Sequence, residues 1–416
     1  MQWLALCAAI FTWAHSVHAG AVCSVPDEQK ALVTSLQLNM AKSVGPCVPP
    51  DPSILLALNL GSKNLNPEAR ELLIKQLKED AIKKVSQDLP FTSGKVALYI
   101  LALRSSCSDP CQISRPNGNL NLVKVLEEKT SAEIKSIENT HSPMTTYYQV
   151  ALDVLALCVM SSPRAFPAAT TLSKAIPPNP SGPAFSVDTA AVAVMGFSCV
   201  LSMDTTHTES IKTLKNAQSI MLDLILKQKK SDGTIGNIYS TGLAGQALTA
   251  AQLYYPPGSW DCPLTVQKIL QQIRQGTFSL PIAAAQVLPF LNGRSYLNVK
   301  GMQCQANNAT LITVDYTIVN DLTGDYFKHS IQVAVPEGST LLKVMEKAAE
   351  VNPKEFSFST EETSWGLFIT SINNLGGNSN QKTYWQFFSG ITPLEEGVST
   401  YKPHNKEHIL AIFSKY

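Results

Sequence analysis

The chain has 416 residues, and its 33 Lys and Arg residues balance 32 Asp and Glu residues to leave a net charge of +1. This length exceeds what one compact core usually holds, so we expect two domains. The balanced charge and the lack of a dense basic cluster argue against a nucleic-acid partner.

The N-terminus has the pattern of a secretory signal peptide, Met1–Ala19. Leu4–Ala14 is an apolar run too short to span a bilayer, and Val17-His18-Ala19 provides the small residues that a signal peptidase accepts. No later stretch reaches ~18 uninterrupted apolar residues. We therefore expect a secreted, extracellular protein with no membrane insertion.

Nine cysteines are present, and Cys7 would be removed with the signal peptide. The remaining even number favours disulfide bonds in a secreted chain, although about 105 pairings are possible. Zinc binding is the alternative, but the nearest pair, Cys107 and Cys111, has no His or second Cys pair at zinc-finger spacing. Asn308 begins the one good glycosylation sequon.

A recurring pattern fills residues 20–292, the first expected domain. Segments rich in Ala, Leu, Gly and Ser start 41 to 52 residues apart, which is the period of a repeated helix pair. These segments are residues 52–60, 93–103, 145–158, 187–199, 239–252 and 280–291. Charged, amphipathic stretches alternate with them at Asp27–Lys42, Pro67–Val85, Leu120–Glu138, Phe166–Ile176, Glu209–Lys227 and Pro263–Gln275.

We interpret the almost uncharged segments as buried inner helices and the amphipathic stretches as outer helices with one face in water. This interpretation predicts a mainly α protein built on an α6/α6 barrel of six helix pairs. An open, linear solenoid is the alternative. Six pairs without a polar capping repeat favour closure.

After a polar linker over residues 293–309, the periodicity becomes that of strands. Leu311–Val319 and Ser330–Val335 alternate with a period of two, whereas Thr340–Glu350 has a helical apolar face. Further strand candidates are Phe356–Phe358, Gly366–Ile372, Tyr384–Ser389 and His408–Phe413. Residues 310–416 are therefore predicted to form a small α+β domain.

This small domain contains two aromatic runs without a charged residue, Ser364–Ile372 and Thr383–Leu394. Gly366, Gly390 and Pro393 interrupt the runs where a plain core strand would need no interruption. Such a pair can form an uncharged wall for a large, flat ligand with a polar rim. The alternative is that the runs form the core and a hairpin of the small domain.

The starts of the predicted inner helices carry almost only neutral side chains that donate or accept hydrogen bonds. In a closed ring these starts converge at one end of the barrel. Helix capping explains Ser93, Ser186 and Ser240. It does not explain Gln149 and Gln286, which lie among apolar residues and need polar partners. The candidate binding set is Lys95, Thr145, Thr146, Tyr147, Tyr148, Gln149, Asp188, Asn237, Ser240 and Gln286.

Catalytic patterns are missing from the inner segments. A glycoside hydrolase needs two carboxylates facing its cavity, but the inner segments contain only Asp153 and Asp188, and Asp153 lies midway along its helix. No inner segment has a His for a zinc site, and the chain has no GxSxG elbow, P-loop or GxGxxG motif. We therefore expect no catalytic residues, no metal-ligating residues and no enzyme activity.

The chain resembles the vertebrate cobalamin-transport proteins, the family of intrinsic factor, haptocorrin and transcobalamin, with the intrinsic factor or haptocorrin type nearest. The resemblance covers essentially the whole mature chain. Its pieces are PSILLALNL at Pro52–Leu60, ALRSSC at Ala102–Cys107, YYQVALDVLALC at Tyr147–Cys158, SVDTAA at Ser186–Ala191, IYSTGLAGQAL at Ile238–Leu248, AQVLPFLNGRSYL at Ala285–Leu297, SWGLFITSINN at Ser364–Asn374 and TYWQFFSGITPLEEGV at Thr383–Val398.

The resemblance implies a non-enzymatic carrier that holds cobalamin between the barrel and the smaller domain and delivers it to a cell-surface endocytic receptor. Amides on the rim of the corrin ring would explain a site built from neutral polar side chains. We expect a monomer. To the barrel set, the resemblance adds Ser364, Trp365, Gly366, Leu367, Phe368, Ile369, Trp385, Gln386, Phe387, Phe388, Ser389, Gly390, Ile391, Thr392, Pro393 and Leu394 of the small domain.

The same resemblance implies three disulfide bonds, Cys23–Cys262, Cys107–Cys304 and Cys158–Cys199. Cys47 and Cys111 are then left over, and we predict a fourth bond between them.

Two positions depart from the family pattern. Lys95 stands where other members have Gln, although a Lys can still donate a hydrogen bond to a ligand carbonyl. Ala184 stands where transcobalamin has a His that can coordinate cobalt. We therefore predict that no protein imidazole reaches the metal of the ligand.

Two other classes of protein share an α/α barrel. One is a secreted carbohydrate-active enzyme, and the other is a protein-binding inhibitor related to complement. The absence of a Cys-Gly-Glu-Gln thioester sequence counts against the second class.

Overall fold

The computed structural model describes residues 23–62, 65–115, 118–203, 208–302, 311–363 and 366–416. The chain divides into two compact units, Met1–Met302 and Gln303–Tyr416. Each unit has a hydrophobic core of its own. The predicted signal peptide and the glycosylation site at Asn308 lie outside the described residues.

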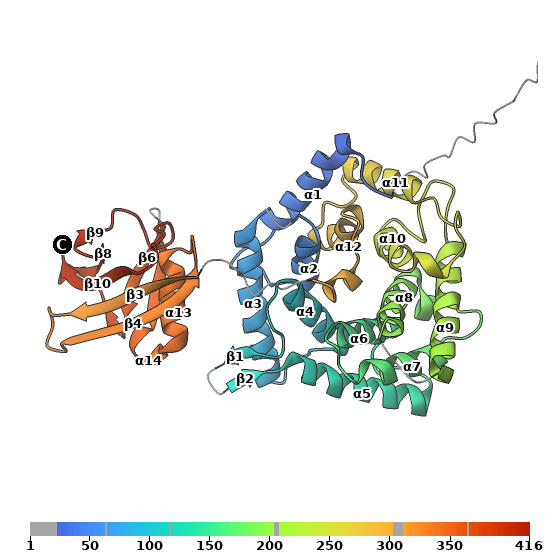
Figure 1. Cartoon of the computed structure of the whole chain (residues 1–416), viewed down its shortest axis with the longest axis horizontal. Helices are drawn as coiled ribbons and strands as arrows, with labels where there is room; N and C mark the ends of the chain where they lie inside the picture. The colour runs from blue at the N-terminus through green and yellow to red at the C-terminus, as the bar shows by residue number, and fades with distance from the viewer. Residues whose placement is uncertain (1–22, 63–64, 116–117, 204–207, 303–310, 364–365) are drawn as a thin grey trace, which may run out of the picture. The chain divides into compact units, whose positions relative to one another are not determined.

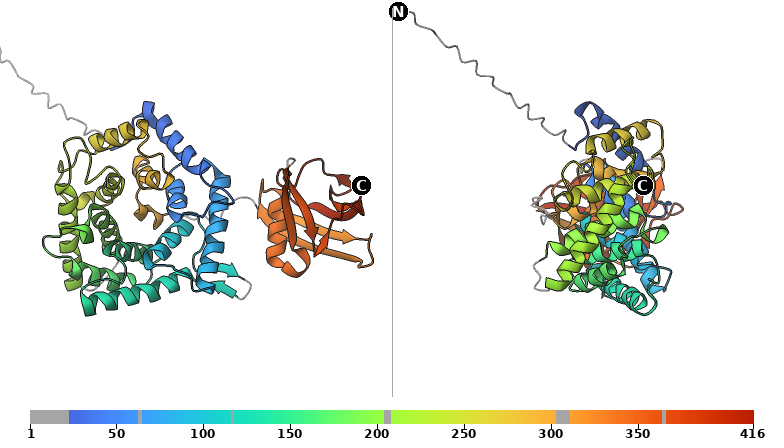
Figure 2. Two further views of the ribbon diagram at one scale, coloured as in Figure 1. Left: turned by 180° about the vertical axis from the view of Figure 1, so that it is seen from behind. Right: turned by 90° about the vertical axis from the view of Figure 1, so that its right-hand side faces the viewer.

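The first unit is a closed ring of helices, seen end-on in Figure 1 and from behind in Figure 2. Each inner helix packs against the next, and α12 packs against α2, which closes the ring. The inner helices are α2 (Pro52–Leu60), α4 (Ser93–Ser105), α6 (Tyr147–Val159), α8 (Val187–Leu201), α10 (Ser240–Ala250) and α12 (Pro281–Leu291). The predicted α6/α6 barrel is confirmed, and closure excludes the linear solenoid.

Each outer helix precedes one inner helix and lies outside the inner ring. The outer helices are α1 (Lys30–Lys42), α3 (Pro67–Ser86), α5 (Leu122–Thr140), α7 (Ala165–Ala175), α9 (Thr208–Lys227) and α11 (Cys262–Arg274). Shorter elements are η1 (Asp27–Gln29), β1 (Ile113–Arg115), β2 (Gly118–Leu120), η2 (Pro183–Phe185), η3 (Gln252–Tyr254) and η4 (Tyr296–Val299). The strands β1 and β2 form an antiparallel hairpin between α4 and α5.

The inner helices approach one another closely because small residues line their contacts. A Cβ atom added to Gly242 of α10 would lie 2.5 Å from the backbone oxygen of Gln286 in α12, so no larger residue fits there without displacing the backbone. The segment Pro183–Leu201, which contains η2 and α8, is long and apolar enough to cross a membrane by length and composition. Its helix is instead an inner helix of the barrel, and 78% of its apolar stretch is buried.

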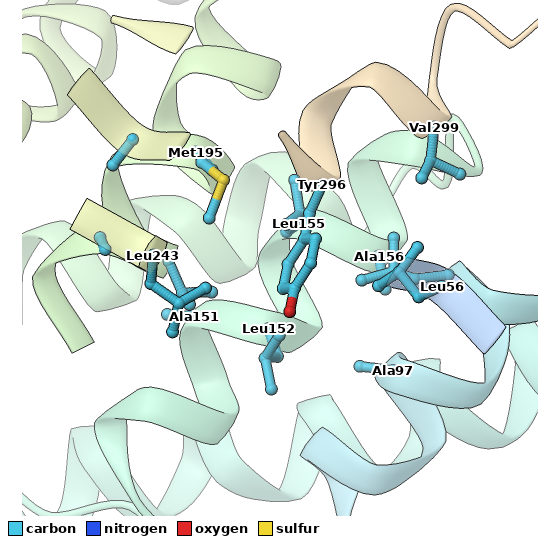
Figure 3. Packing of buried hydrophobic residues seen from close by; sticks show 14 of the residues in the cluster. Leu56, Ala97, Ala151, Leu152, Leu155, Ala156, Met195, Leu243, Tyr296 and Val299 are labelled. Carbon is cyan, nitrogen blue, oxygen red and sulfur yellow. The ribbon is translucent and has the colours of Figure 1, made fainter. Parts of the chain in front are cut away.

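The end of the barrel unit differs from the expected linker over residues 293–309. Tyr296 and Val299 of η4 are buried among the inner helices, next to Leu152, Ala156 and Leu56 in Figure 3. The backbone N–H of Tyr296 donates to Oε1 of Gln246 at 3.1 Å. Residues 293–302 therefore belong to the barrel. Although the segment is mostly polar in sequence, its Tyr296 side chain fills the space between the inner helices.

The structure confirms the disulfide bonds Cys23–Cys262 and Cys158–Cys199. Cys107 is also disulfide-bonded. Its predicted partner, Cys304, lies outside the described residues. The Cys23–Cys262 bond joins positions 239 residues apart, and in theory the restriction of the unfolded chain is greatest for such long loops.

The predicted bond between Cys47 and Cys111 is wrong, because both are free cysteines. The loop before Cys47 is fastened to α3, where Nε2 of Gln76 donates to the backbone oxygen of Gly45 at 2.9 Å. The loop of Cys111 is fastened to the start of α5, where the Leu122 N–H donates to the Pro110 oxygen at 2.9 Å. The prediction rested on the even number of cysteines, which contains no information about which loops meet. The two loops are held by different outer helices.

The second unit is the expected small α+β domain. Its main sheet has the strand order β4-β3-β10-β8-β9, in which only β3 and β10 are parallel neighbours among the described strands. A second sheet has the order β5-β6-β7, and α13 packs against β3 and β4. The elements are β3 (Leu311–Asn320), β4 (Phe327–Pro336), α13 (Leu341–Val351), α14 (Pro353–Phe356), β5 (Phe358–Thr363), β6 (Gly366–Ile372), β7 (Leu375–Gly376), β8 (Thr383–Ser389), β9 (Thr392–Pro393) and β10 (Glu407–Lys415).

Candidate functional site

A pocket of about 640 Å³ opens at the end of the barrel where the inner helices start. Its volume falls in the usual range of small-molecule sites. The lining comes from the segment before α6, the first turn of α6, η2, the first turn of α8 and the middle of α12. The lining residues are Ser142, Pro143, Thr145, Thr146, Tyr147, Tyr148, Pro183, Ala184, Ser186, Asp188, Thr189 and Gln286.

This pocket brings together part of the predicted barrel set, namely Thr145, Thr146, Tyr147, Tyr148, Asp188 and Gln286. Ser240 is adjacent, because its hydroxyl donates to Oδ2 of Asp188 at 3.2 Å. Asn237 instead caps the start of α10, where its Oδ1 accepts from the Ser240 N–H. The Lys95 ammonium lies over the ring of Tyr99, 6.0 Å from its centroid, and Lys95 does not line the pocket.

Two neighbouring tyrosines line the pocket. The ring of Tyr147 stacks on Phe185 with centroids 4.7 Å apart, and its hydroxyl donates to the His141 oxygen at 3.0 Å. Burial, together with the nearby charge of Asp188, raises the pKa of Tyr148 to about 12. The Tyr148 hydroxyl therefore keeps its proton at neutral pH and can donate a hydrogen bond.

Asp188 is the one acid among the described residues that line the pocket. Its Oδ1 atom is buried and has no hydrogen-bond partner among the described residues. Burial raises its pKa, and the hydrogen bond from Ser240 partly offsets that effect. A buried acceptor without a partner is costly unless a bound molecule supplies a donor, so Oδ1 is suited to receive a ligand N–H.

The two glutamines that capping did not explain differ in role. Oε1 of Gln149 accepts from the Gly94 N–H at 3.2 Å, so this side chain joins the starts of α4 and α6 and has a partner inside the protein. Gln286 lines the pocket, and its backbone oxygen accepts from Nε2 of Gln246 at 2.9 Å. Sequence reasoning missed Gln246, which is fully buried and links α12 to η4.

The pocket contains no histidine among its described lining residues, and Ala184 occupies the position discussed for a cobalt ligand. No group of three or more His, Cys, Asp or Glu residues in the described part of the chain could hold a metal ion. The lining therefore offers neutral hydrogen-bonding groups and apolar surface to a ligand, with one carboxylate.

A pair of buried carboxyl groups lies behind this pocket. Asp153 of α6 is fully buried, Glu133 of α5 is 3% exposed, and Asp153 has no hydrogen-bond partner among the described residues. Burial raises the pKa of Asp153 well above its ordinary value, and the nearby charge of Glu133 adds to this rise. The side-chain hydroxyl groups of Ser93 and Thr130 act in the opposite direction and lower the pKa. Neither acid lines the pocket, so neither can act on a molecule bound there.

The small domain places its predicted contact residues in three different settings. Trp385 and Ile369 belong to its core, and the Trp385 indole N–H donates to the Leu375 oxygen at 2.9 Å. Phe387 and Leu394 pack against that core, and Leu367, Gln386, Phe388 and Ser389 are half-buried. Phe368 and Ile391 are 45% and 96% exposed, and Gly390, Thr392 and Pro393 are exposed beside them.

The interruptions in the second aromatic run form a tight hairpin. Ser389 of β8 pairs with Thr392 of β9, and Gly390 has a φ of +58°, which favours glycine. Sequence reasoning missed Glu407, which holds this hairpin because its Oε1 accepts from Ser389 Oγ at 2.6 Å. Ser364 and Trp365 lie outside the described residues, and Gly366 begins β6.

Comparisons with known proteins give a consistent set of relatives. The sequence matches the family described as eukaryotic cobalamin-binding protein over residues 5–320. Cobalamin binding intrinsic factor from Mus musculus is 39% identical with 100% of both chains covered, and the Homo sapiens protein of that name is 38% identical with the same coverage. Transcobalamin-1 from Homo sapiens is 33% identical over 95% of this chain and 94% of its own.

The solved structure of haptocorrin in complex with Cbi is similar to this chain with a TM-score of 0.57 and 33% identity. The match covers 95% of this chain and 100% of the haptocorrin chain.

The buried carboxyl of Asp153 predicts an unusual dependence of stability on pH. Because its folded pKa lies above its unfolded pKa, the folded state holds the proton more tightly, and stability falls as pH rises from about 4 towards the folded pKa. Asp153→Asn removes this titration. We expect the difference in melting temperature, Asp153→Asn minus wild type, to increase by a few degrees as the pH rises from 4.5 to 7.

Thermal unfolding of both proteins at several pH values checks this expectation. The exposed acid Asp223 provides a control, since Asp223→Asn should show no such trend. A difference between Asp153→Asn and the wild type that stays constant from pH 4.5 to pH 7 would show that Asp153 titrates normally.

Proposed function

The chain belongs to the family of eukaryotic cobalamin-binding proteins, and we propose that it is a secreted, monomeric carrier that binds cobalamin at the barrel pocket and delivers it to a cell-surface endocytic receptor. Secretion is supported by the signal-like sequence at residues 1–19 and by the disulfide bonds of the barrel. The receptor and the monomeric state rest on the resemblance alone.

The chemistry of the pocket is the observation that carries this proposal. Cobalamin presents neutral amides around a large apolar ring, and the pocket offers neutral hydroxyl and amide groups, tyrosine rings and the unpartnered Oδ1 of Asp188. Hydrogen-bonded recognition of neutral amides needs neutral donors and acceptors more than charged side chains. The predicted contacts from the small domain remain part of the proposal, and Phe368 and Ile391 are the most exposed apolar candidates among the described residues.

The alternative of a secreted α/α-barrel carbohydrate-active enzyme is not supported. The relatives are named for binding or transporting cobalamin. The buried carboxyl groups Glu133 and Asp153 of the barrel do not line the pocket.

Binding of aquocobalamin tests the proposal and the role of Ala184 together. The purified, oxidised protein is mixed with aquocobalamin and desalted. We expect the absorbance of the corrin to elute with the protein at about one ligand per chain. We also expect the spectrum of the aquo form, since none of the described residues that line the pocket is a histidine. A colourless protein would refute the proposed function, and a spectrum typical of imidazole ligation would refute only the prediction about the metal.

Asp188 provides a test of the site itself. Asp188→Ala removes the buried acceptor, and we expect the dissociation constant for cobalamin to rise about 10-fold, as for the loss of one hydrogen bond to a charged group. Ser202→Ala, at the opposite end of α8, is the matched control and should bind like the wild type. An unchanged affinity of Asp188→Ala would place the ligand away from this pocket.

A further inference from the structure

We propose that Glu133 is a positioning residue that holds the pocket wall formed by residues 145–148 in its ligand-binding geometry. This inference rests on the proposed function, because it concerns the same pocket. It assigns a role to a side chain of an outer helix that does not itself line the pocket.

The burial of Glu133 is the first observation. Glu133 is 3% exposed, although its helix α5 is an outer helix whose acids Glu128 and Glu138 are exposed. No Lys, Arg or His of the described chain forms an ion pair with Glu133. A buried carboxyl group without a counter-ion is costly and must be compensated by hydrogen bonds. Its partners therefore indicate what the residue does.

The hydrogen bonds of Glu133 connect three elements at the pocket end of the barrel. Its Oε1 accepts from Ser93 Oγ at the start of α4, at 3.3 Å. Its Oε2 accepts from the backbone N–H of Thr145, just before α6, at 3.2 Å. Glu133 thus ties the first residue of the pocket wall to the outer helix α5 and to the neighbouring inner helix.

Thr145 depends on this bond more than its neighbours do. Its hydroxyl is buried and has no hydrogen-bond partner among the described residues. The next residues have local anchors: Thr146 Oγ1 accepts from the Gln149 N–H at 3.2 Å, and the Tyr147 hydroxyl donates to the His141 oxygen. Without Glu133, the Thr145 N–H would have no acceptor, and the start of the wall would lose its attachment to α5.

The position of the wall matters because four consecutive residues, 145–148, contribute side chains to the pocket. Binding groups are effective when supporting hydrogen bonds hold them within about 0.5 Å of the productive geometry. A wall that must be ordered during binding costs affinity, whereas a wall already held in place does not. Glu133 therefore supplies preorganisation without touching the ligand.

Two substitutions of Glu133 separate this role from general stability. Glu133→Met keeps the length of the side chain but removes both acceptors, and we expect a roughly 10-fold higher dissociation constant for cobalamin with faster dissociation. Glu133→Gln restores most of the affinity, because its amide oxygen can accept from the Thr145 N–H and its amide N–H can donate to Ser93 Oγ. A purely structural role for the charge would not produce this rescue.

Gln218 provides the matched control. It is a fully buried polar residue of the outer helix α9, and its Nε2 donates to Ser198 Oγ of the inner helix α8 at 2.8 Å. Gln218→Met removes a similar link between outer and inner helices far from the residues that line the pocket. We expect it to lower the melting temperature and to leave the dissociation constant for cobalamin unchanged.

The experiment measures cobalamin affinity, dissociation rate and melting temperature for the wild type and the three variants. An unchanged dissociation constant for Glu133→Met, or an equal rise for Gln218→Met, would overturn the inference. Failure of the wild type to bind would instead overturn the proposed function. If Glu133→Met does not fold, Glu133→Asp serves the same test, because its shorter side chain cannot bridge Ser93 and Thr145.

Discussion

The closed ring of inner helices is the constraint on which the rest of the structure depends. Neighbouring inner helices must approach closely, as at Gly242, where a single added carbon would meet the backbone of α12. Closure brings the helix starts together at one end, and Tyr296 of η4 fills the space among the helices (Figure 3). The interior of the barrel is packed with side chains, and the pocket lies at the end where the helix starts converge.

The polar groups around that pocket follow from the same constraint. Inner helices buried on nearly all sides can carry hydrogen-bonding side chains only where a partner is available. Some of these groups find partners inside the protein, as Gln149 does with Gly94, and others remain available, as Oδ1 of Asp188 does. The buried Glu133 is tolerated because it satisfies a backbone N–H at the edge of the pocket. Hydrogen bonds that stabilise the barrel therefore also hold residues at the edge of the pocket.

Much of this arrangement could be predicted from the sequence, because six uncharged segments at a regular spacing have few ways to be buried other than as an inner ring. The pocket residues near Thr145 and Asp188 followed from their place at helix starts. The partner of Gln149, the link made by Gln246 and the burial of Tyr296 could not be predicted, since each depends on contacts between distant segments. The free cysteines, Cys47 and Cys111, show that counting residues cannot determine which loops meet.

Hydrogen–deuterium exchange of the purified chain with and without cobalamin tests the central claim, that the ligand binds at the convergent helix starts, most directly. The account predicts slower exchange at residues 142–148 and 183–189 when cobalamin is bound, and no change in the last turns of α6 and α8 at the opposite end. Protection confined to that opposite end, or to the outer helices, would contradict it.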